Sequence, residues 1–73
     1  MKRVIRRRVI LDYLRPNGGW TRNPSEAWFP QDLQEALSAV QFYHLKDVDL
    51  VFYSSDRVPS EYTARIALTS QPA

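Results

Sequence analysis

Cysteine is absent from this 73-residue chain, and histidine occurs only once. Without thiols the chain forms no disulfide and carries no thiolate nucleophile, which fits a reducing compartment. The single histidine, His44, has Asp47 and Asp49 close by in the sequence, but one imidazole and two carboxylates are only a partial ligand set for a metal. We expect His44 to be a packed or helix-end residue, and we predict no metal site.

Glycine is also scarce, and the only two glycines are adjacent, in Asn17-Gly18-Gly19. This segment is too short to wrap a phosphate group and does not lead from a strand into a helix, as a phosphate-binding loop does. Ser54 and Ser55 have no second histidine or lysine near them in the sequence to act as a base. The sequence therefore predicts no catalytic residue and no cofactor, and favours a protein that is not an enzyme.

Long apolar runs are missing too, since none approaches the roughly 20 residues that a helix needs to span a bilayer. The basic start of the chain is followed by an apolar stretch, as in a signal peptide, but Asp12 and Arg15 cut that stretch short. We therefore expect mature structure at this end, a cytoplasmic protein and no membrane partner. An apolar content of 44% is too high for a disordered chain, and the length allows a single domain, residues 1–73, with 70–73 frayed.

The charges that are present divide the chain in two. Residues 1–22 hold seven basic side chains and one acidic one, whereas residues 23–61 hold two basic and seven acidic ones. The net charge of +2 thus hides a dipolar chain, whose field orients an approaching charged partner.

The apolar periodicity changes twice along the chain. Residues 3–14 alternate, which predicts one long half-buried strand with Ile5, Val9, Leu11 and Tyr13 on its core side. Residues 16–19 predict a reversal, and residues 20–22 a short return strand. Apolar side chains at helical spacing predict a helix over 31–44, with Pro30 in its first turn. Its buried stripe comprises Leu33, Ala36, Leu37, Val40 and either Tyr43 or His44.

Two further alternating runs, over 48–53 and 62–69, predict a hairpin with a loose loop over 54–60. The elements thus come in the order strand, strand, helix, strand, strand. This order predicts an α+β fold of two layers, with one helix packed on a three- or four-stranded antiparallel sheet.

The sheet face away from the helix is expected to be solvated. It would carry Arg6, Arg8, Asp12, Asp49, Tyr53, Thr63 and Arg65, alongside Ile10, Val51 and Ala67. Such a mixture of arginine, tyrosine and aliphatic side chains is typical of protein interfaces. We therefore predict Arg6, Arg8, Tyr53 and Arg65 as partner-binding residues.

The run Arg6-Arg7-Arg8 has two interpretations. It either protects an edge or overhanging strand from pairing with other chains, or it forms a basic ridge that contacts phosphates or carboxylates. Only Tyr53 is well placed to stack on a nucleic-acid base, and acidic residues on the same surface repel phosphate.

Two aromatic residues are candidate anchors for a partner. Trp28 and Phe29 are adjacent, so in an extended chain they point to opposite sides and one of them is exposed. Phe42 lies about 180° from Leu33 on a helical wheel and faces outward if the helix runs that far. If the helix ends earlier, Phe42 folds back onto the core. An exposed aromatic ring beside arginine is typical of an interface hot spot, so we predict Trp28 and Phe42 as anchors.

A resemblance appears between Gly18 and about Leu37. The residues Gly19, Trp20, Thr21, Asn23, Pro24, Ala27, Phe29, Glu35 and Ala36 carry it. The pattern is similar to that of small phage and mobile-element proteins, in which a Gly-Trp-Thr turn precedes Asn/Asp-Pro and a helix with Glu-Ala. In size and plan the chain also resembles anti-CRISPR proteins, small α+β inhibitors that bind surveillance complexes. Many of those are acidic and this chain is not, so the resemblance implies binding to a protein subunit rather than DNA mimicry.

Together these features predict a non-catalytic binding module, encoded by a phage and acting in the host cytoplasm on a protein or ribonucleoprotein complex. One alternative is a nucleic-acid-binding accessory protein that uses the basic first strand. Another is a homodimeric phage component that buries the same face against a second copy.

Overall fold

A computed structural model describes residues 2–54 and 64–68 of the chain. In chain order the elements are β1 (Lys2–Arg7), β2 (Tyr13–Leu14), β3 (Trp20–Thr21), the short 3₁₀ helix η1 (Pro24–Glu26), α1 (Leu33–Tyr43), β4 (Val48–Tyr53) and β5 (Ala64–Leu68). Most of the predicted 54–60 loop, the predicted face residue Thr63 and the expected frayed end at 70–73 lie outside the described residues.

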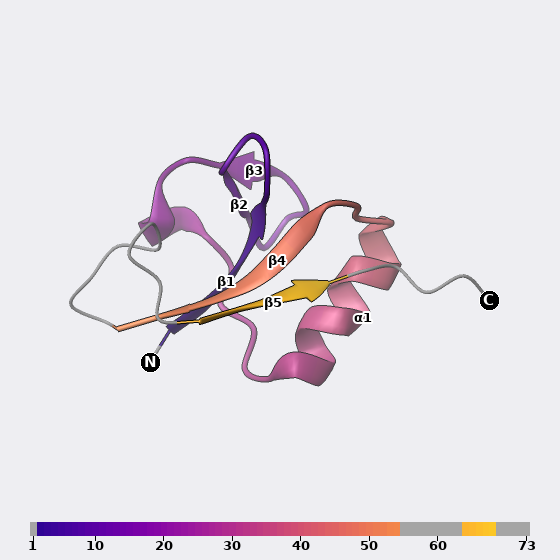
Figure 1. The fold of residues 1–73 in the computed structure, drawn as a ribbon. Coiled ribbons are helices and arrows are strands. Elements are labelled where there is room, and N and C mark those ends of the chain that lie inside the picture. The colour runs from indigo at the N-terminus through magenta and orange to yellow at the C-terminus, as the bar shows by residue number, and fades with distance from the viewer. Residues whose placement is uncertain (1, 55–63, 69–73) are drawn as a thin grey trace.

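The five strands form one antiparallel sheet in the order β3-β2-β1-β4-β5 (Figure 1). β1 pairs with β4 along its whole length, from Lys2 opposite Tyr53 to Arg7 opposite Val48. One helix on an antiparallel sheet confirms the α+β class. The sheet has more strands than expected. Because β1 lies between β2 and β4, the interpretation of the arginine run as protection of an edge strand is wrong.

The extra strand arises from a turn inside the predicted long strand. The Arg7 N–H donates to the Asp12 carbonyl and the Leu11 N–H to the Arg7 carbonyl, both at 3.0 Å, so the chain reverses after β1. Leu11 has a φ of 65°, and this left-handed conformation costs a branched L-residue about 1–2 kcal/mol. The expectation that Val9 and Leu11 face the core is wrong. Val9, Ile10 and Leu11 form an exposed hairpin tip, at 87%, 48% and 52% exposure.

The start of α1 is fixed by a capping residue. The Asp32 side chain accepts a hydrogen bond of 2.8 Å from the Glu35 N–H, which satisfies one of the free donors of the first turn. The helix therefore begins at Leu33, and Pro30 precedes it rather than lying in its first turn.

The buried side of α1 is narrower than predicted. Ala36, Ala39 and Val40 are buried, whereas Leu33 and Leu37 are exposed. Small side chains on this side let the helix approach the sheet closely, so the buried stripe turns toward Ala39.

The end of α1 decides between the two expectations for Phe42. The helix extends to Tyr43, so Phe42 lies in its last turn and is 75% exposed, as expected for a helix of that length. His44 follows as an exposed helix-end residue with φ 54°, and its N–H donates to the Gln41 and Val40 carbonyls.

No helix in the described ranges combines the length and apolar character that crossing a membrane requires.

Apolar side chains are buried on both faces of the sheet. The helix-side cluster contains Ile5, Leu14, Ala36, Ala39, Val40, Leu45, Val48, Leu50 and Leu68. The second cluster, on the other face, contains Val4, Tyr13, Ala27, Val51 and Tyr53. The expectation of a solvated second face is therefore wrong in its centre. Ala27 belongs to the second cluster, so the segment that follows η1 covers part of this face.

Candidate protein-binding groove

An apolar groove of about 410 Å³ lies between α1 and the beginning of the β2–β3 turn. Its lining comes from Arg15, Pro16, Trp28, Glu35, Ser38, Ala39, Phe42 and Tyr43. The two anchors predicted from the sequence, Trp28 and Phe42, are 14 positions apart in the chain and line the same groove. A groove whose lining surface is mainly apolar, with the aromatic rings of Trp28, Phe42 and Tyr43 in it, is suited to hold an apolar side chain.

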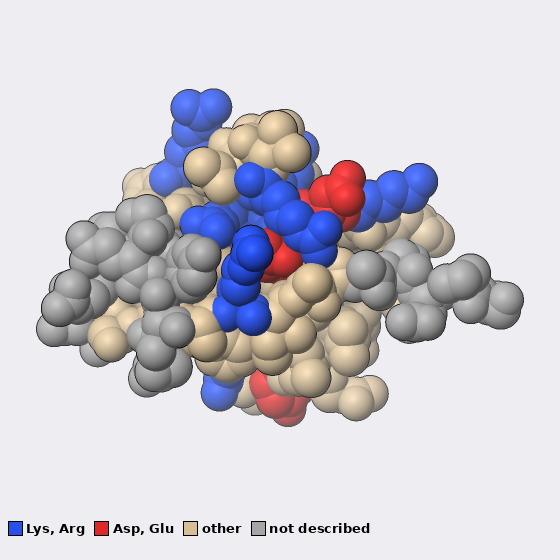
Figure 2. Space-filling model, viewed as in Figure 1, with Lys and Arg blue, Asp and Glu red and all other residues tan. Residues whose placement is uncertain are grey.

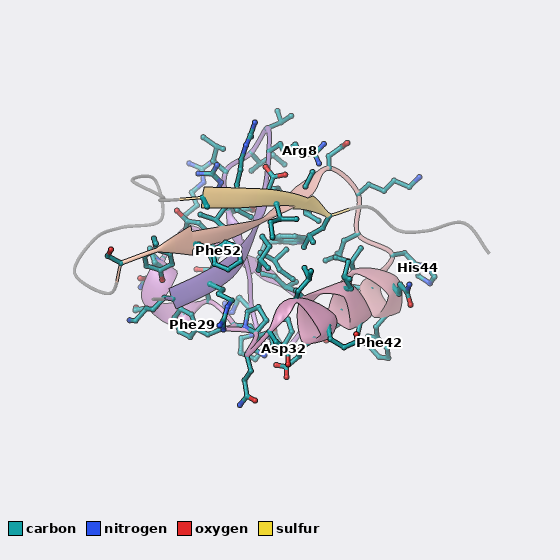
Figure 3. The ribbon with its side chains drawn as sticks, turned by 60° about the horizontal axis from the view of Figure 1, so that its bottom comes forward. Arg8, Phe29, Asp32, Phe42, His44 and Phe52 are labelled. Atoms are coloured by element: carbon teal, nitrogen blue, oxygen red, sulfur yellow. The ribbon has the colours of Figure 1, made fainter. Side chains whose placement is uncertain are left out.

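The β2–β3 turn packs on the last turn of α1 and sets one end of the groove. Gly18 has a φ of 89°, and a Cβ atom built on it would lie 2.6 Å from Cε1 of Tyr43. Glycine therefore allows both the turn conformation and the close approach to the helix. The Tyr43 ring in turn contacts Phe42 edge to face, with ring centroids 4.8 Å apart. This pairing orients the Phe42 ring although most of it faces solvent (Figure 3).

Trp28 is held at the other side of the groove by its main chain and its ring. Its N–H donates to the Leu14 carbonyl at 2.8 Å, which ties the segment to the end of β2. The half-buried ring packs against the helix-side cluster. The adjacent Phe29 is 39% exposed, with the Lys2 ammonium 5.3 Å from its ring centroid. Trp28 thus offers the groove one face of a ring that is otherwise fixed.

Two charged residues border the groove. The Glu35 carboxylate accepts a hydrogen bond of 3.4 Å from the Gln31 N–H, so it is directed toward the start of its own helix. Within residues 2–54 and 64–68, no ion pair involves Arg15. The Arg15 guanidinium is therefore the charge in this groove that is available to a carboxylate from outside.

The residues predicted on the opposite sheet face are only partly accessible. Arg6 and Tyr53 are 8% and 3% exposed, so their prediction as surface contacts is wrong. The side chains of Arg8 and Arg65 remain 36% and 55% exposed, and both bind the buried Asp49. Arg8 Nε lies 2.9 Å from Asp49 Oδ1, and Arg65 Nη1 lies 3.4 Å from Oδ2. Figure 2 shows basic side chains gathered around acidic atoms on this face.

The alternating pattern predicted Asp49 on a solvated face, but its carboxylate is buried. A buried aspartate is stable only when cations or other donors pair with it, and the two arginines fill this role. The pKa of Tyr53 is raised, first by its burial and then by the neighbouring Tyr13. A buried Tyr53 ring is also out of reach of a nucleic-acid base, which removes the one stacking position that the sequence offered.

A second ion pair fixes the base of the hairpin tip. Arg7 Nε donates to Asp12 Oδ1 at 2.6 Å, and Arg7 Nη2 pairs with Oδ2 of the same carboxylate. The hydrogen bonds from Arg7 hold the pKa of the Asp12 carboxyl below its usual range. The Arg7 guanidinium also lies 4.3 Å from the centroid of the Trp20 ring. The tip therefore projects from a rigid base.

Metal-ligating side chains do not gather in the described residues, where no group of three or more His, Asp or Glu forms a site. His44 is exposed at the helix end, and Asp49 is engaged with two arginines.

The chain was compared with protein-family models, with curated proteins and with solved structures. None of the three comparisons found a match.

The sequence did not predict every residue of the groove. Pro16 was predicted only as part of the reversal over 16–19, Arg15 only as a charge that ends the apolar stretch, and Tyr43 as one of two options for the end of the helix stripe. The glycine pair is the sequence signal for these groove residues. A glycine at position 18 leaves room for a neighbouring element, and in the structure the Tyr43 ring of α1 fills that room. The exposed Val9-Ile10-Leu11 segment was also missed, because its alternation matched that of a strand.

Proposed function

We propose that this chain is a non-catalytic protein-binding module that takes an apolar side chain of its partner into the groove between Trp28 and Phe42. The observation that carries the proposal is the meeting of a fixed half-buried indole and a 75% exposed phenylalanine in one apolar groove. Exposed aromatic rings in an apolar pocket are the usual anchors of protein interfaces, and leaving one in water is unfavourable for an isolated monomer.

The charges narrow the chemistry of the partner. Arg15 borders the groove without an ion pair in the described part of the chain, whereas Glu35 is turned toward the helix start. A partner segment with an apolar or aromatic residue next to a carboxylate is complementary to both features, because arginine binds carboxylates in a fixed two-point geometry.

The biological setting of the proposal comes from the resemblance to small phage proteins. In that setting the partner is a subunit of a host defence complex, such as a CRISPR effector, and the module acts by occupying a surface that the complex needs. The basic residues in 1–22 support an acidic partner surface through electrostatic steering.

A pull-down from lysate of a host cell, with and without nuclease, tests the proposal. Tagged protein should retain a stoichiometric protein partner after nuclease treatment, and Phe42→Ser should weaken the retention at least tenfold, as expected for an interface anchor. Phe42 is mostly exposed, so this change should leave the unfolding temperature nearly unaltered. Gln41→Ser, at an exposed neighbouring position, is the matched control and should bind like the unmodified chain.

The same experiment separates the alternatives. Recovery of nucleic acid alone, lost with nuclease and falling steeply with added salt, would replace the proposal by a nucleic-acid accessory role. Recovery of only a second copy of the chain, with a mass in light scattering that doubles with concentration, would indicate a homodimeric component.

A further inference from the structure

The hairpin tip breaks two local rules at once. Val9, Ile10 and Leu11 are three consecutive aliphatic residues that face solvent, at a turn where polar residues and glycine normally occur. Leu11 also holds a left-handed φ of 65°, which asparagine or glycine adopts far more readily than leucine. Neither choice favours folding of the isolated chain. Such departures from local preference are expected at functional positions.

An ion pair and a backbone hydrogen bond at its base hold the hairpin tip in place. At the base of the tip Arg7 and Asp12 form a two-point ion pair, and the Arg8 N–H donates to the Asp47 carbonyl at 2.9 Å. The turn before β4 thus supports the turn after β1. The tip keeps its shape without a partner, so little ordering is needed when it binds.

Basic groups lie beside the aliphatic tip. A hollow of about 150 Å³ next to it is lined by Val9, Ile10, Arg7, Lys46 and Asp47. The Asp47 carboxylate lies 3.9 Å from the Arg8 guanidinium, and Arg22 is close enough to Asp12 to lower its pKa. The cations at this end therefore outnumber the carboxylates.

The space-filling view shows the same arrangement on the surface. Tan atoms at the top, where the β1–β2 turn lies in Figure 1, are bordered by several basic side chains and, on the right, by acidic atoms (Figure 2). An apolar point beside a surface with an excess of basic groups is complementary to a surface that is anionic outside and apolar beneath.

We propose that the hairpin tip is a membrane-docking site that inserts Val9, Ile10 and Leu11 into the surface of an anionic lipid bilayer, with Arg8 and Lys46 at the level of the headgroups. This site is distinct from the groove between Trp28 and Phe42 and does not depend on the function proposed for it. Stable peripheral binding needs two signals, an apolar insertion and a basic patch, and this end of the molecule carries both. The absence of a spanning helix does not bear on it, because insertion of a turn needs only a few side chains.

The shape of the site favours lipid over a protein surface. The aliphatic groups project from the end of a hairpin, so a protein partner would need an apolar pocket of matching shape with an acidic rim. A bilayer adapts to a projecting tip, and its anionic headgroups interact with the surrounding cations.

Co-sedimentation with vesicles tests the proposal directly. The full chain should bind vesicles of phosphatidylcholine with one third phosphatidylserine, and should bind vesicles of phosphatidylcholine alone at least tenfold more weakly. The triple variant Val9→Ser, Ile10→Ser, Leu11→Asn should lose at least tenfold in binding to the anionic vesicles. Because asparagine tolerates the left-handed φ, this variant should unfold at the same or a higher temperature, which separates lost binding from lost folding.

The charges are tested separately. Lys46→Gln should weaken binding to the anionic vesicles about fivefold, the contribution of one basic residue near an anionic surface. Lys46 is exposed, so its replacement should not alter folding.

The absence of cysteine allows the insertion itself to be observed. A fluorophore sensitive to polarity, attached to the Val9→Cys variant, should shift to shorter wavelength when the anionic vesicles are added. The same label on Gln41→Cys, at an exposed position of α1 outside the groove, should not shift. Failure of the chain to bind the anionic vesicles would overturn the proposal, as would equal binding by the triple variant or equal shifts of the two labels. Tip-dependent binding to a soluble acidic protein or to an oligonucleotide, with none to vesicles, would also overturn it.

Discussion

Asp12 shows how one side chain can hold a turn that has no glycine or proline. Its carboxylate binds Arg7 at two points, and the Arg7 guanidinium stacks near the Trp20 ring. The same residue pair closes the turn through the main chain, since the Arg7 N–H donates to the Asp12 carbonyl. Side chain and backbone therefore fix the reversal together.

Asp12→Asn should lower the free energy of unfolding by about 1–3 kcal/mol at pH 7, because Arg7 then donates to a neutral amide instead of a charged carboxylate. Urea unfolding measures the difference. Asp47→Asn is the matched control, because that side chain is 82% exposed and its loss should change stability by less than about 0.5 kcal/mol.

The pH dependence gives the same prediction an independent check. The folded-state pKa of Asp12 is depressed, so the stabilisation is present above its unfolded value of about 4 and is lost as the pH falls through the lower folded value. The gap between the original chain and Asp12→Asn should therefore close at acid pH. A gap that stayed constant down to pH 2 would contradict the assignment.

At the scale of elements, the sequence predicted the strands and the helix whose apolar periodicity stops close to the ends of the element. The β4 strand was found because its alternation starts directly after Asp47, and α1 was found from its helical spacing, although it begins at Leu33 and ends at Tyr43, inside the predicted range of 31–44. The β1–β2 hairpin was missed because alternation of charged and aliphatic residues runs through the turn, which lacks glycine, proline and asparagine. Only the pairing of Arg7 with Asp12 reveals the reversal.

The residues of the candidate site also divide into those whose position depends on local geometry and those whose position depends on contacts between distant strands. The outward direction of Phe42 follows from helical geometry, which is local, but only for a helix that reaches it, and the sequence left that length open. The burial of Arg6 and Tyr53 depends on strands that are far apart in the chain, as the register of Arg6 with Asp49 shows. A single sequence does not indicate which residues meet across a sheet, so that part of the site was wrong.

Gly18→Ala tests the packing of the β2–β3 turn on α1. The new methyl group would meet the Tyr43 ring at 2.6 Å in a left-handed conformation, so the free energy of unfolding should fall by about 1–3 kcal/mol. Gly19→Ala should be milder, since its nearest neighbour would be the Asn17 side chain at 3.1 Å and its φ is not left-handed. In a Tyr43→Ala background the loss at Gly18 should shrink, and an unchanged loss would assign it to the backbone alone.

At the scale of the molecule, the sheet is the shared wall of two apolar clusters. Val40 belongs to the helix-side cluster and Val51 to the second cluster, and both are fully buried. A chain of this length cannot stabilise two clusters independently, so we expect them to unfold as one unit.

Val51→Ala and Val40→Ala should each lower stability by on the order of 2 kcal/mol, as expected for a truncated core side chain. Trp20 and Trp28 both pack against the helix-side cluster, so tryptophan fluorescence reports on that cluster alone. Val51→Ala should nevertheless shift the fluorescence and circular dichroism transitions equally in urea. A shift in circular dichroism without one in fluorescence would mean that the second cluster unfolds by itself.

The central place of β1 in the sheet also has a consequence for biosynthesis. The ribosome makes β1 before its partner β4, which starts only at Val48, after β2, β3 and α1. Until β4 is made, one side of β1 is an unpaired strand edge. Other copies of the nascent chain are then being made nearby on the same messenger RNA. We expect the three consecutive arginines, Arg6 to Arg8, to repel those copies during that interval. Such repulsion would keep neighbouring nascent chains apart until β4 closes the sheet.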